Sequence, residues 1–280
     1  MAIFSYLLGS WTRICGFRWI GSEPFTSASK CSARSVILVA GAMVTGISLR
    51  AADLTVFAAA SLSDALKEIA QSYEPASGDK LRFNFSASSA LARQIKEGAP
   101  ADVFFSADQA KLDGLAKDGL IVADTRRSLL SNTLVIVVPA DGGASVAASA
   151  DLALPAVRRI ALAETQTVPA GIYAKAYLQK VELWSRISPK VVATENVRAT
   201  LAAVESGNAD AGIVYRTDAL GSRKVRVAYE ITLAEGPAIS YPIAVVKECK
   251  HTEAARRLVA YLGAAEARAI FARYGFLPAP

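Results

Sequence analysis

Short apolar segments alternate with amphipathic segments from residue 53 to the C-terminus. The apolar segments predict β-strands at 53–58, 81–85, 102–106, 134–139, 159–163, 190–193, 211–215, 225–228 and 241–246. Apolar residues at three- and four-residue spacing predict helices at 61–74, 90–98, 111–118, 168–184, 195–207 and 252–274, the last in two pieces around Gly263. Pro75 opens a predicted turn at 75–80. The alternation predicts an α/β fold with mainly parallel sheets and helices on both faces.

One strand-to-helix junction, at 56–66, has the features of an anion site. Small residues at 58–61 allow a sharp turn, and Ser61 with Asp64 forms a weak capping-box pattern. A helix start presents unpaired N–H groups and a partial positive charge, so it can hold an anion without Lys or Arg. The alternative is an ordinary junction in which Ser61 only caps the helix.

Ligands of parallel sheets bind beyond the carboxyl ends of the strands, where helices begin. Four junctions of this kind are rich in small or hydroxyl residues, at 58–62, 85–90, 163–171 and 193–197. These junctions are therefore the candidates for a ligand site.

The composition fits a compact protein without a nucleic-acid surface. The chain has 280 residues, a length sufficient for one large or two modest domains. Its hydrophobic share of 52% suits a compact α/β protein. The net charge of +6 is concentrated in residues 1–51, which hold five basic residues and one acidic residue. The remainder has 26 basic and 24 acidic residues, a net charge of +2, and nucleic acid is not an expected partner.

The N-terminal segment 1–51 resembles an export signal. Lys30 and Arg34 precede an apolar run over 35–49, which is too short and too rich in small residues for a confident transmembrane span. Ala51, with Leu49 two residues before it, is a plausible signal-peptidase site. An uncleaved anchor is the alternative.

Cysteine and histidine are scarce. Cys15 and Cys31 would leave with the signal segment, so Cys249 remains alone and no internal disulfide is expected. Cys249 is interpreted as a small buried apolar residue. His251 is the only histidine, which argues against His-rich metal sites, and we interpret it as a solvated loop residue.

Six ordered motifs resemble those of one protein family. They are VFAAASL at 56–62, FSASSALARQI at 85–95, GAPADVFFSAD at 98–108, VPAGIYA at 168–174, GIVY at 212–215 and RYGF at 273–276. Together they resemble the periplasmic molybdate-binding proteins of ABC transporters over residues 53–278. Each motif is moderately specific, and their shared order makes the resemblance strong.

The resemblance implies a two-lobed periplasmic binding protein fold, with the ligand in the cleft between lobes. One lobe would hold 52–130 and 240–280, and the other would hold 131–239. It also implies a monomeric periplasmic receptor that delivers molybdate or tungstate to an inner-membrane ABC permease, with no catalytic residue and no cofactor.

The family's ligand-binding positions map here onto Ser61, Ser88, Ala170, Val197 and Tyr215. By resemblance, the two Ser and the Tyr would donate through hydroxyls, and Ala170 and Val197 would donate through backbone N–H groups. These residues would bind the metal as its oxyanion, not as a bare cation.

The sequence departs from the family pattern before the VPAGIYA motif. Family members often carry Gly or Ala followed by Asp-Pro there, whereas this chain has Ala163-Glu164-Thr165. Ser86-Ala87 is a slighter variant of the usual pair of small residues. The first departure puts the local loop shape in question more than the class of ligand.

The chemistry of the mapped residues favours a fully deprotonated dianion. Charge-assisted hydrogen bonds are strong, and helix starts add positive potential. The set has no carboxylate that could accept a proton, so hydrogen phosphate should be rejected. Molybdate, tungstate and sulfate all satisfy this condition.

The sequence is also compatible with other functions. The ligand could be sulfate, thiosulfate or a small organic acid, although an organic acid would usually call for an Arg clamp. A serine hydrolase with Ser61 or Ser88 as nucleophile would need an activating base, and the chain has no Gly-x-Ser-x-Gly motif. Tyr215 could also be a core aromatic residue, and Ala170 simply a helix start. Charged residues elsewhere are interpreted as structural (Arg93 and Asp102) or as a solvated loop (223–226).

Overall fold

The computed structural model describes residues 51–142 and 145–279. The predicted signal segment, with Cys15 and Cys31, lies outside the described residues except for Ala51. Within the described ranges, no helix combines the length and apolar character needed to cross a membrane.

Six strands form the first sheet, in the spatial order β11-β4-β10-β3-β1-β2. Their bounds are β1 Asp53–Ala59, β2 Lys80–Ser86, β3 Val103–Phe105, β4 Arg127–Ser131, β10 Tyr241–Val245 and β11 Leu277–Pro278. Strand β1 is parallel to β2 and β3, whereas β10 is antiparallel to β3 and β4. Strand β11 is antiparallel to β4.

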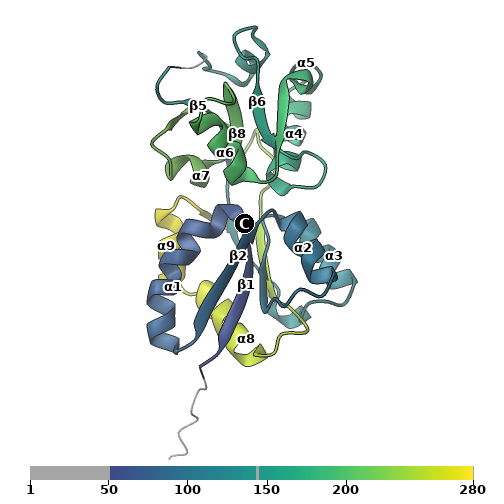
Figure 1. Cartoon of the computed structure of the whole chain (residues 1–280), viewed down its shortest axis with the longest axis vertical. Coiled ribbons are helices and arrows are strands. Elements are labelled where there is room, and N and C mark those ends of the chain that lie inside the picture. The colour runs from purple at the N-terminus through teal and green to yellow at the C-terminus, as the bar shows by residue number, and fades with distance from the viewer. Residues whose placement is uncertain (1–50, 143–144, 280) are drawn as a thin grey trace, which may run out of the picture. The chain divides into compact units, whose positions relative to one another are not determined.

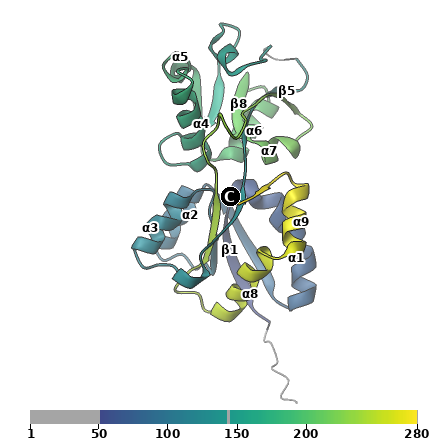
Figure 2. The ribbon, with the colours of Figure 1, turned by 180° about the vertical axis from the view of Figure 1, so that it is seen from behind.

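Helices cover both faces of the first sheet. They are α1 Ser63–Ser77, α2 Ser88–Lys96, α3 Gln109–Lys117, α8 Thr252–Leu262 and α9 Ala265–Arg273. Both views show α1 and α9 on one side of the sheet and α2 and α3 on the other (Figure 1 and Figure 2). Successive side chains of a strand face opposite ways. Accordingly, Leu54 and Val56 of β1 join one apolar core while Phe57 joins the other.

Five strands form the second sheet, in the order β7-β6-β8-β5-β9. Their bounds are β5 Leu134–Pro139, β6 Ile160–Ala163, β7 Val191–Thr194, β8 Ala211–Tyr215 and β9 Val225–Glu230. Strand β6 is parallel to β7 and β8, and β5 is antiparallel to β8 and β9. The accompanying helices are α4 Pro169–Lys180, α5 Trp184–Ile187, α6 Val197–Glu205 and α7 Arg216–Leu220.

The predicted α/β fold with helix-flanked sheets is confirmed, but both sheets are mixed rather than mainly parallel. The chain leaves the first sheet after β4 and returns through β10, so these paired strands run in opposite directions. The same holds for β5 and β9, through which the chain enters and leaves the second sheet. The crossings lie at 132–133 and 231–240. The lobe boundaries given above remain a prediction.

Individual elements also differ from the sequence pattern. Helix α1 continues through Pro75 for two more residues, so the turn begins later than predicted. The helix ends at Ser77, and Gly78 follows as its C-cap with a φ of 78°, which suits glycine, and an N–H that donates to the carbonyl of Glu74. The sequence pattern does not predict strands β4 and β11. The two leucines of β4 are adjacent, so its apolar and polar residues do not alternate, and β11 has only two residues. The break near Gly263 is confirmed between α8 and α9.

Candidate functional site

The four candidate junctions surround one small cavity. Its empty volume, part of which is open to solvent, is about 230 Å³. The cavity is lined by Ala59, Ala60, Ser61, Ser86, Ala87, Ser88, Ala107, Val168, Pro169, Ala170, Asn196, Val197 and Tyr215. The structure thus brings together the five residues mapped from the resemblance, Ser61, Ser88, Ala170, Val197 and Tyr215. Each of these five is at most 4% exposed.

Ser61 follows β1, in a 3-10 turn (Ala60–Leu62) that precedes α1. The expected capping box with Asp64 is wrong, because this turn moves the N-cap of α1 to Leu62. Instead, the Oγ of Ser61 lies 3.1 Å from the hydroxyl of Tyr241, at the start of β10. Ser61 is therefore positioned by a residue far away in the sequence.

Ser88 is the first residue of α2, and the N-cap residue before it, Ala87, has no polar side chain. The N–H of Ala107 donates a 2.9 Å hydrogen bond to the Oγ of Ser88. A hydroxyl accepts through its lone pairs and donates its own proton, so the Ser88 proton remains free for a group in the cavity. Neither Ser61 nor Ser88 occupies the N-cap position of an α-helix, which argues against plain capping roles.

Ala170 is the second residue of α4, after Pro169, with Val168 at the N-cap. Gly171 allows this helix start to lie directly against the end of β6. A Cβ on Gly171 would lie 2.1 Å from the carbonyl oxygen of Ala163, which is closer than real atoms approach. The absence of a side chain at Gly171 therefore allows the start of α4, with Ala170, to line the cavity.

Glu164, where the sequence departs from the family pattern, stabilises the loop before α4 through hydrogen bonds. The Glu164 carboxylate accepts from the N–H groups of Gln166 and Thr167, both at 2.8 Å, and from the Thr167 hydroxyl at 2.6 Å. The Thr167 hydroxyl is the main cause that lowers the pKa of Glu164, and the backbone donors add to it. An ionised Glu164 thus holds the turn that leads to Val168 and the cavity.

Val197 is the first residue of α6, and Asn196 is its N-cap. The Asn196 side chain accepts from the N–H of Arg198 at 2.9 Å and of Ala199 at 3.0 Å. The cap therefore satisfies the second and third N–H groups of the helix and leaves that of Val197 to the cavity. Asn196 falls inside the predicted helix 195–207, whereas the structure makes it the N-cap, a position for which Asn directly before a helix is a known signal.

Tyr215 ends β8 and is 1% exposed. Among the described residues, its hydroxyl has no hydrogen-bond partner. Burial raises the pKa of Tyr215 well above its usual value, so the hydroxyl stays neutral and keeps its proton. A buried polar group without a partner costs about 1–3 kcal/mol. This hydroxyl is therefore suited to donate to a bound group.

The cavity as a whole presents donors and partial positive charge. The residues that precede the 3-10 turn, α2 and α4, which are Ala59, Ala87 and Val168, make no side-chain cap. The first N–H groups of these helices are therefore free of a capping acceptor. All the lining residues are described, and none of them is Lys, Arg, His, Asp or Glu. This arrangement suits a small anion that accepts hydrogen bonds on every side.

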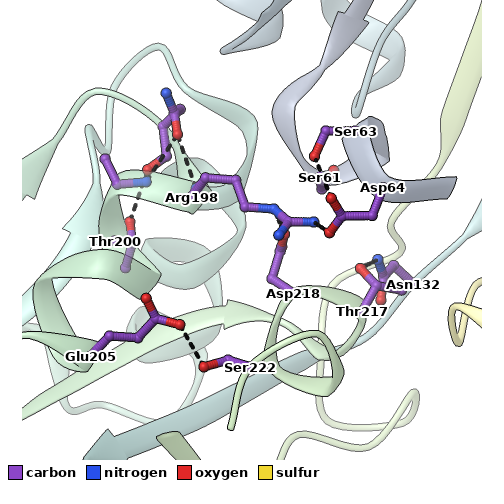
Figure 3. Close-up of polar contacts among 12 residues, drawn as sticks. Ser61, Ser63, Asp64, Asn132, Arg198, Thr200, Glu205, Thr217, Asp218 and Ser222 are labelled. Carbon is purple, nitrogen blue, oxygen red and sulfur yellow. Dashed lines mark hydrogen bonds and ion pairs between the residues drawn. The ribbon is translucent and has the colours of Figure 1, made fainter. Parts of the chain in front are cut away.

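An ion-pair cluster is formed by the residue next to Val197 (Figure 3). Arg198 Nη2 lies 2.7 Å from Asp64 Oδ2 of α1, and Arg198 Nε lies 2.7 Å from Asp218 Oδ1 of α7. Asp218 is fully buried, and this burial raises its pKa to about 7 although Arg198 lowers it. The cluster joins a helix of the first sheet to two helices of the second.

Residues interpreted as structural lie away from the cavity. Asp102 accepts the N–H of Thr55 at 2.7 Å, which ties it to the first sheet. His251 is exposed at the start of α8, and Cys249 is only half-buried rather than buried. Within the described ranges, no group of three or more His, Cys, Asp or Glu side chains could hold a metal ion.

A nucleophilic serine would need an activating base within hydrogen-bond reach. The recorded partner of the Ser61 hydroxyl is Tyr241, and that of Ser88 is a backbone N–H. Neither contact supplies a base, so the geometry gives the hydrolase alternative no support.

Comparisons with known proteins agree with this picture. A profile of the family described as bacterial extracellular solute-binding protein matches residues 54–277. The putative ABC transporter substrate-binding lipoprotein YvgL of Bacillus subtilis (strain 168) is 42% identical over 224 residues, covering 80% of this chain and 85% of the relative. The molybdate-binding protein ModA of Escherichia coli (strain K12) is 41% identical over 232 residues, covering 80% and 88%.

A solved structure is similar as well. It is the substrate-binding domain of a putative molybdenum ABC transporter from Clostridium difficile, with a TM-score of 0.65 and 35% identity. The match covers 82% of this chain and all of that domain. The similarity therefore extends over both sheets.

Proposed function

We propose that this chain, which belongs to the family of bacterial extracellular solute-binding proteins, captures molybdate, and also tungstate, in the cavity lined by Ser61 and Tyr215. The observation that carries the proposal is a cavity, lined by buried residues, that brings together helix starts and hydroxyls without an ionised side chain. The protein acts as a receptor and not as an enzyme.

The donors of the proposed site match a deprotonated tetrahedral oxyanion. Three hydroxyls, of Ser61, Ser88 and Tyr215, and two backbone N–H groups, of Ala170 and Val197, supply its hydrogen bonds. A dianion without a proton accepts all of them. Hydrogen phosphate would bring a proton that finds no ionised acceptor in the cavity, and an unmade buried hydrogen bond weakens binding.

The chemistry of the lining and the relatives together favour one ligand. Among the described residues, the cavity is lined by no Arg or Lys that would clamp an organic acid. The Escherichia coli relative is named for molybdate binding, which favours molybdate over sulfate. Sulfate is the second candidate because it is also a tetrahedral dianion without a proton.

Capture would be coupled to closure and delivery. The proposed donors come from helix starts of both sheets, so a bound anion would bridge the two. A hinge motion about the two chain crossings would then enclose it. We place this receptor in the periplasm as a monomer that hands the anion to an inner-membrane ABC permease.

Removing one hydroxyl tests the proposed site. Ser61→Ala and Tyr215→Phe should each weaken molybdate binding by about 1.5–3 kcal/mol, the value of a hydrogen bond to a charged group. This corresponds to about 10- to 150-fold in Kd, measured by calorimetric titration.

Ser63→Ala is the matched control for these variants. Ser63 lies two residues beyond Ser61, and its hydroxyl contacts the Asp64 carboxylate at 3.5 Å without lining the cavity. Its Kd should remain within twofold of the wild type. Unchanged affinity in both Ser61→Ala and Tyr215→Phe would remove these hydroxyls from the site.

A further inference from the structure

We infer that Tyr241 and Asn132 are positioning residues that orient the Ser61 hydroxyl as a donor to the bound anion. The inference rests on the proposed function and concerns two residues that do not line the cavity. Asn132 lies at the first crossing between the sheets, and Tyr241 lies just after the second.

The orientation of the Asn132 amide is fixed by its neighbours. The N–H of Thr133 donates to Asn132 Oδ1 at 2.9 Å, so the oxygen of this amide faces Thr133. The Nδ2 then donates to Thr217 Oγ1 at 2.9 Å and to Tyr241 Oη at 3.3 Å (Figure 3 shows Asn132 beside Thr217). Asn132 is 1% exposed, which leaves it no contact with bulk water.

The Tyr241 hydroxyl connects Asn132 to Ser61 through two hydrogen bonds. It accepts from Asn132, and its other neighbour is the Oγ of Ser61 at 3.1 Å. Tyr241 is fully buried, and burial raises its pKa, so it keeps its proton. Among the described contacts, the arrangement that leaves no proton unpaired has Tyr241 donating to Ser61.

As a consequence, the Ser61 hydroxyl has a fixed hydrogen-bond direction. Its Oγ accepts from Tyr241, so its own proton is directed to the cavity. A protonated anion that donated to Ser61 could not at the same contact accept the Ser61 proton, so the hydrogen bond from Ser61 to the anion would be lost. The Oγ of Ser88 likewise accepts a hydrogen bond, from the N–H of Ala107, which leaves its own proton for the cavity. The hydrogen bonds from Asn132 to Tyr241 and from Tyr241 to Ser61 therefore favour the binding of fully deprotonated oxyanions.

A double-mutant cycle with molybdate tests this role on the full chain. Tyr241→Phe should raise the Kd for molybdate by about tenfold in the wild type, since Ser61 loses its fixed orientation. In the Ser61→Ala background the same substitution should change the Kd by less than about twofold, because it acts through Ser61. Ser88 is oriented by the N–H of Ala107 and not by Tyr241. In the Ser88→Ala background, Tyr241→Phe should therefore still raise the Kd by about tenfold.

The outcomes separate the inference from the proposed function. An equal loss in the Ser61→Ala background would show a merely structural role and overturn the inference, as would an unchanged Kd in Tyr241→Phe. Should Tyr241→Phe fail to fold, Asn132→Ala takes its place in the cycle with the same expected pattern. Failure of the wild type to bind any oxyanion would instead overturn the proposed function.

Discussion

Replacing Arg198 with methionine should lower the free energy of unfolding by about 3–5 kcal/mol, the cost of leaving a buried charge without its partner. The reason is Asp218, which is fully buried and has its carboxylate 2.7 Å from Arg198 Nε. Methionine keeps much of the length of the side chain but none of its charge. Urea denaturation at pH 8 measures the change.

Two further variants separate the contributions of Arg198. Asp64→Asn should cost less than about 1 kcal/mol, because the Asp64 side chain is 42% exposed and its pairing is screened by water. Adding Asp218→Asn to Arg198→Met should recover most of the stability, since it removes the unpaired charge. A double variant less stable than Arg198→Met alone would contradict this explanation.

The stability loss in Arg198→Met should also depend on pH. Folded Asp218 has a pKa of about 7, above the value near 4 of the unfolded chain. The folded state therefore binds the extra proton between these values, and the stability from this group falls as pH rises from about 4 to 7. Without Arg198 the folded pKa rises further, so the penalty should shrink as pH is lowered toward 5.

Gly171→Ala should disrupt the site through the backbone. The added Cβ would lie 2.1 Å from the carbonyl oxygen of Ala163 and 2.4 Å from that of Glu164, so the start of α4 must move away from β6. The N–H of Ala170 would move with it. Losing this hydrogen bond to the anion should weaken molybdate binding by at least about tenfold, as measured by titration. Overpacking should also cost about 1–3 kcal/mol of stability.

Gly114→Ala in α3 is the matched control. A Cβ there would meet only the Nζ of Lys96 at 3.9 Å, an ordinary contact. This variant should bind molybdate normally and gain up to about 1 kcal/mol of stability, because alanine favours the helix. If Gly171→Ala behaved like Gly114→Ala, the close approach of α4 would not be what builds the site.

The sequence pattern and the family resemblance anticipate different parts of this molecule. Periodicity predicts most helices and strands because the core residues of each element recur locally. It does not give the direction of β4, β5 and β10, which depends on how the chain crosses between the sheets. The mapping of Ser61 and Tyr215 came from resemblance, and the structure places both on one cavity. Their binding role stays a prediction.

Features that depend on distant residues could not be read from local patterns. The contact between Ser61 and Tyr241 spans 180 residues, so no motif around either residue signals it. The need for glycine at 171 depends on the carbonyl oxygens of Ala163 and Glu164. The expected capping box failed because a 3-10 turn precedes α1, a choice that the composition of the turn does not determine.

The most direct test of the proposed receptor is calorimetric titration of the purified protein with molybdate, tungstate, sulfate and phosphate at neutral pH. A cavity of hydroxyls and helix starts without an ionised side chain predicts tight one-to-one binding of molybdate and tungstate, weaker binding of sulfate and no binding of phosphate. Sulfate binding without molybdate binding would overturn the choice of ligand while keeping the donor site. Phosphate bound as tightly as molybdate, or no binding of any of the four anions, would contradict the proposal itself.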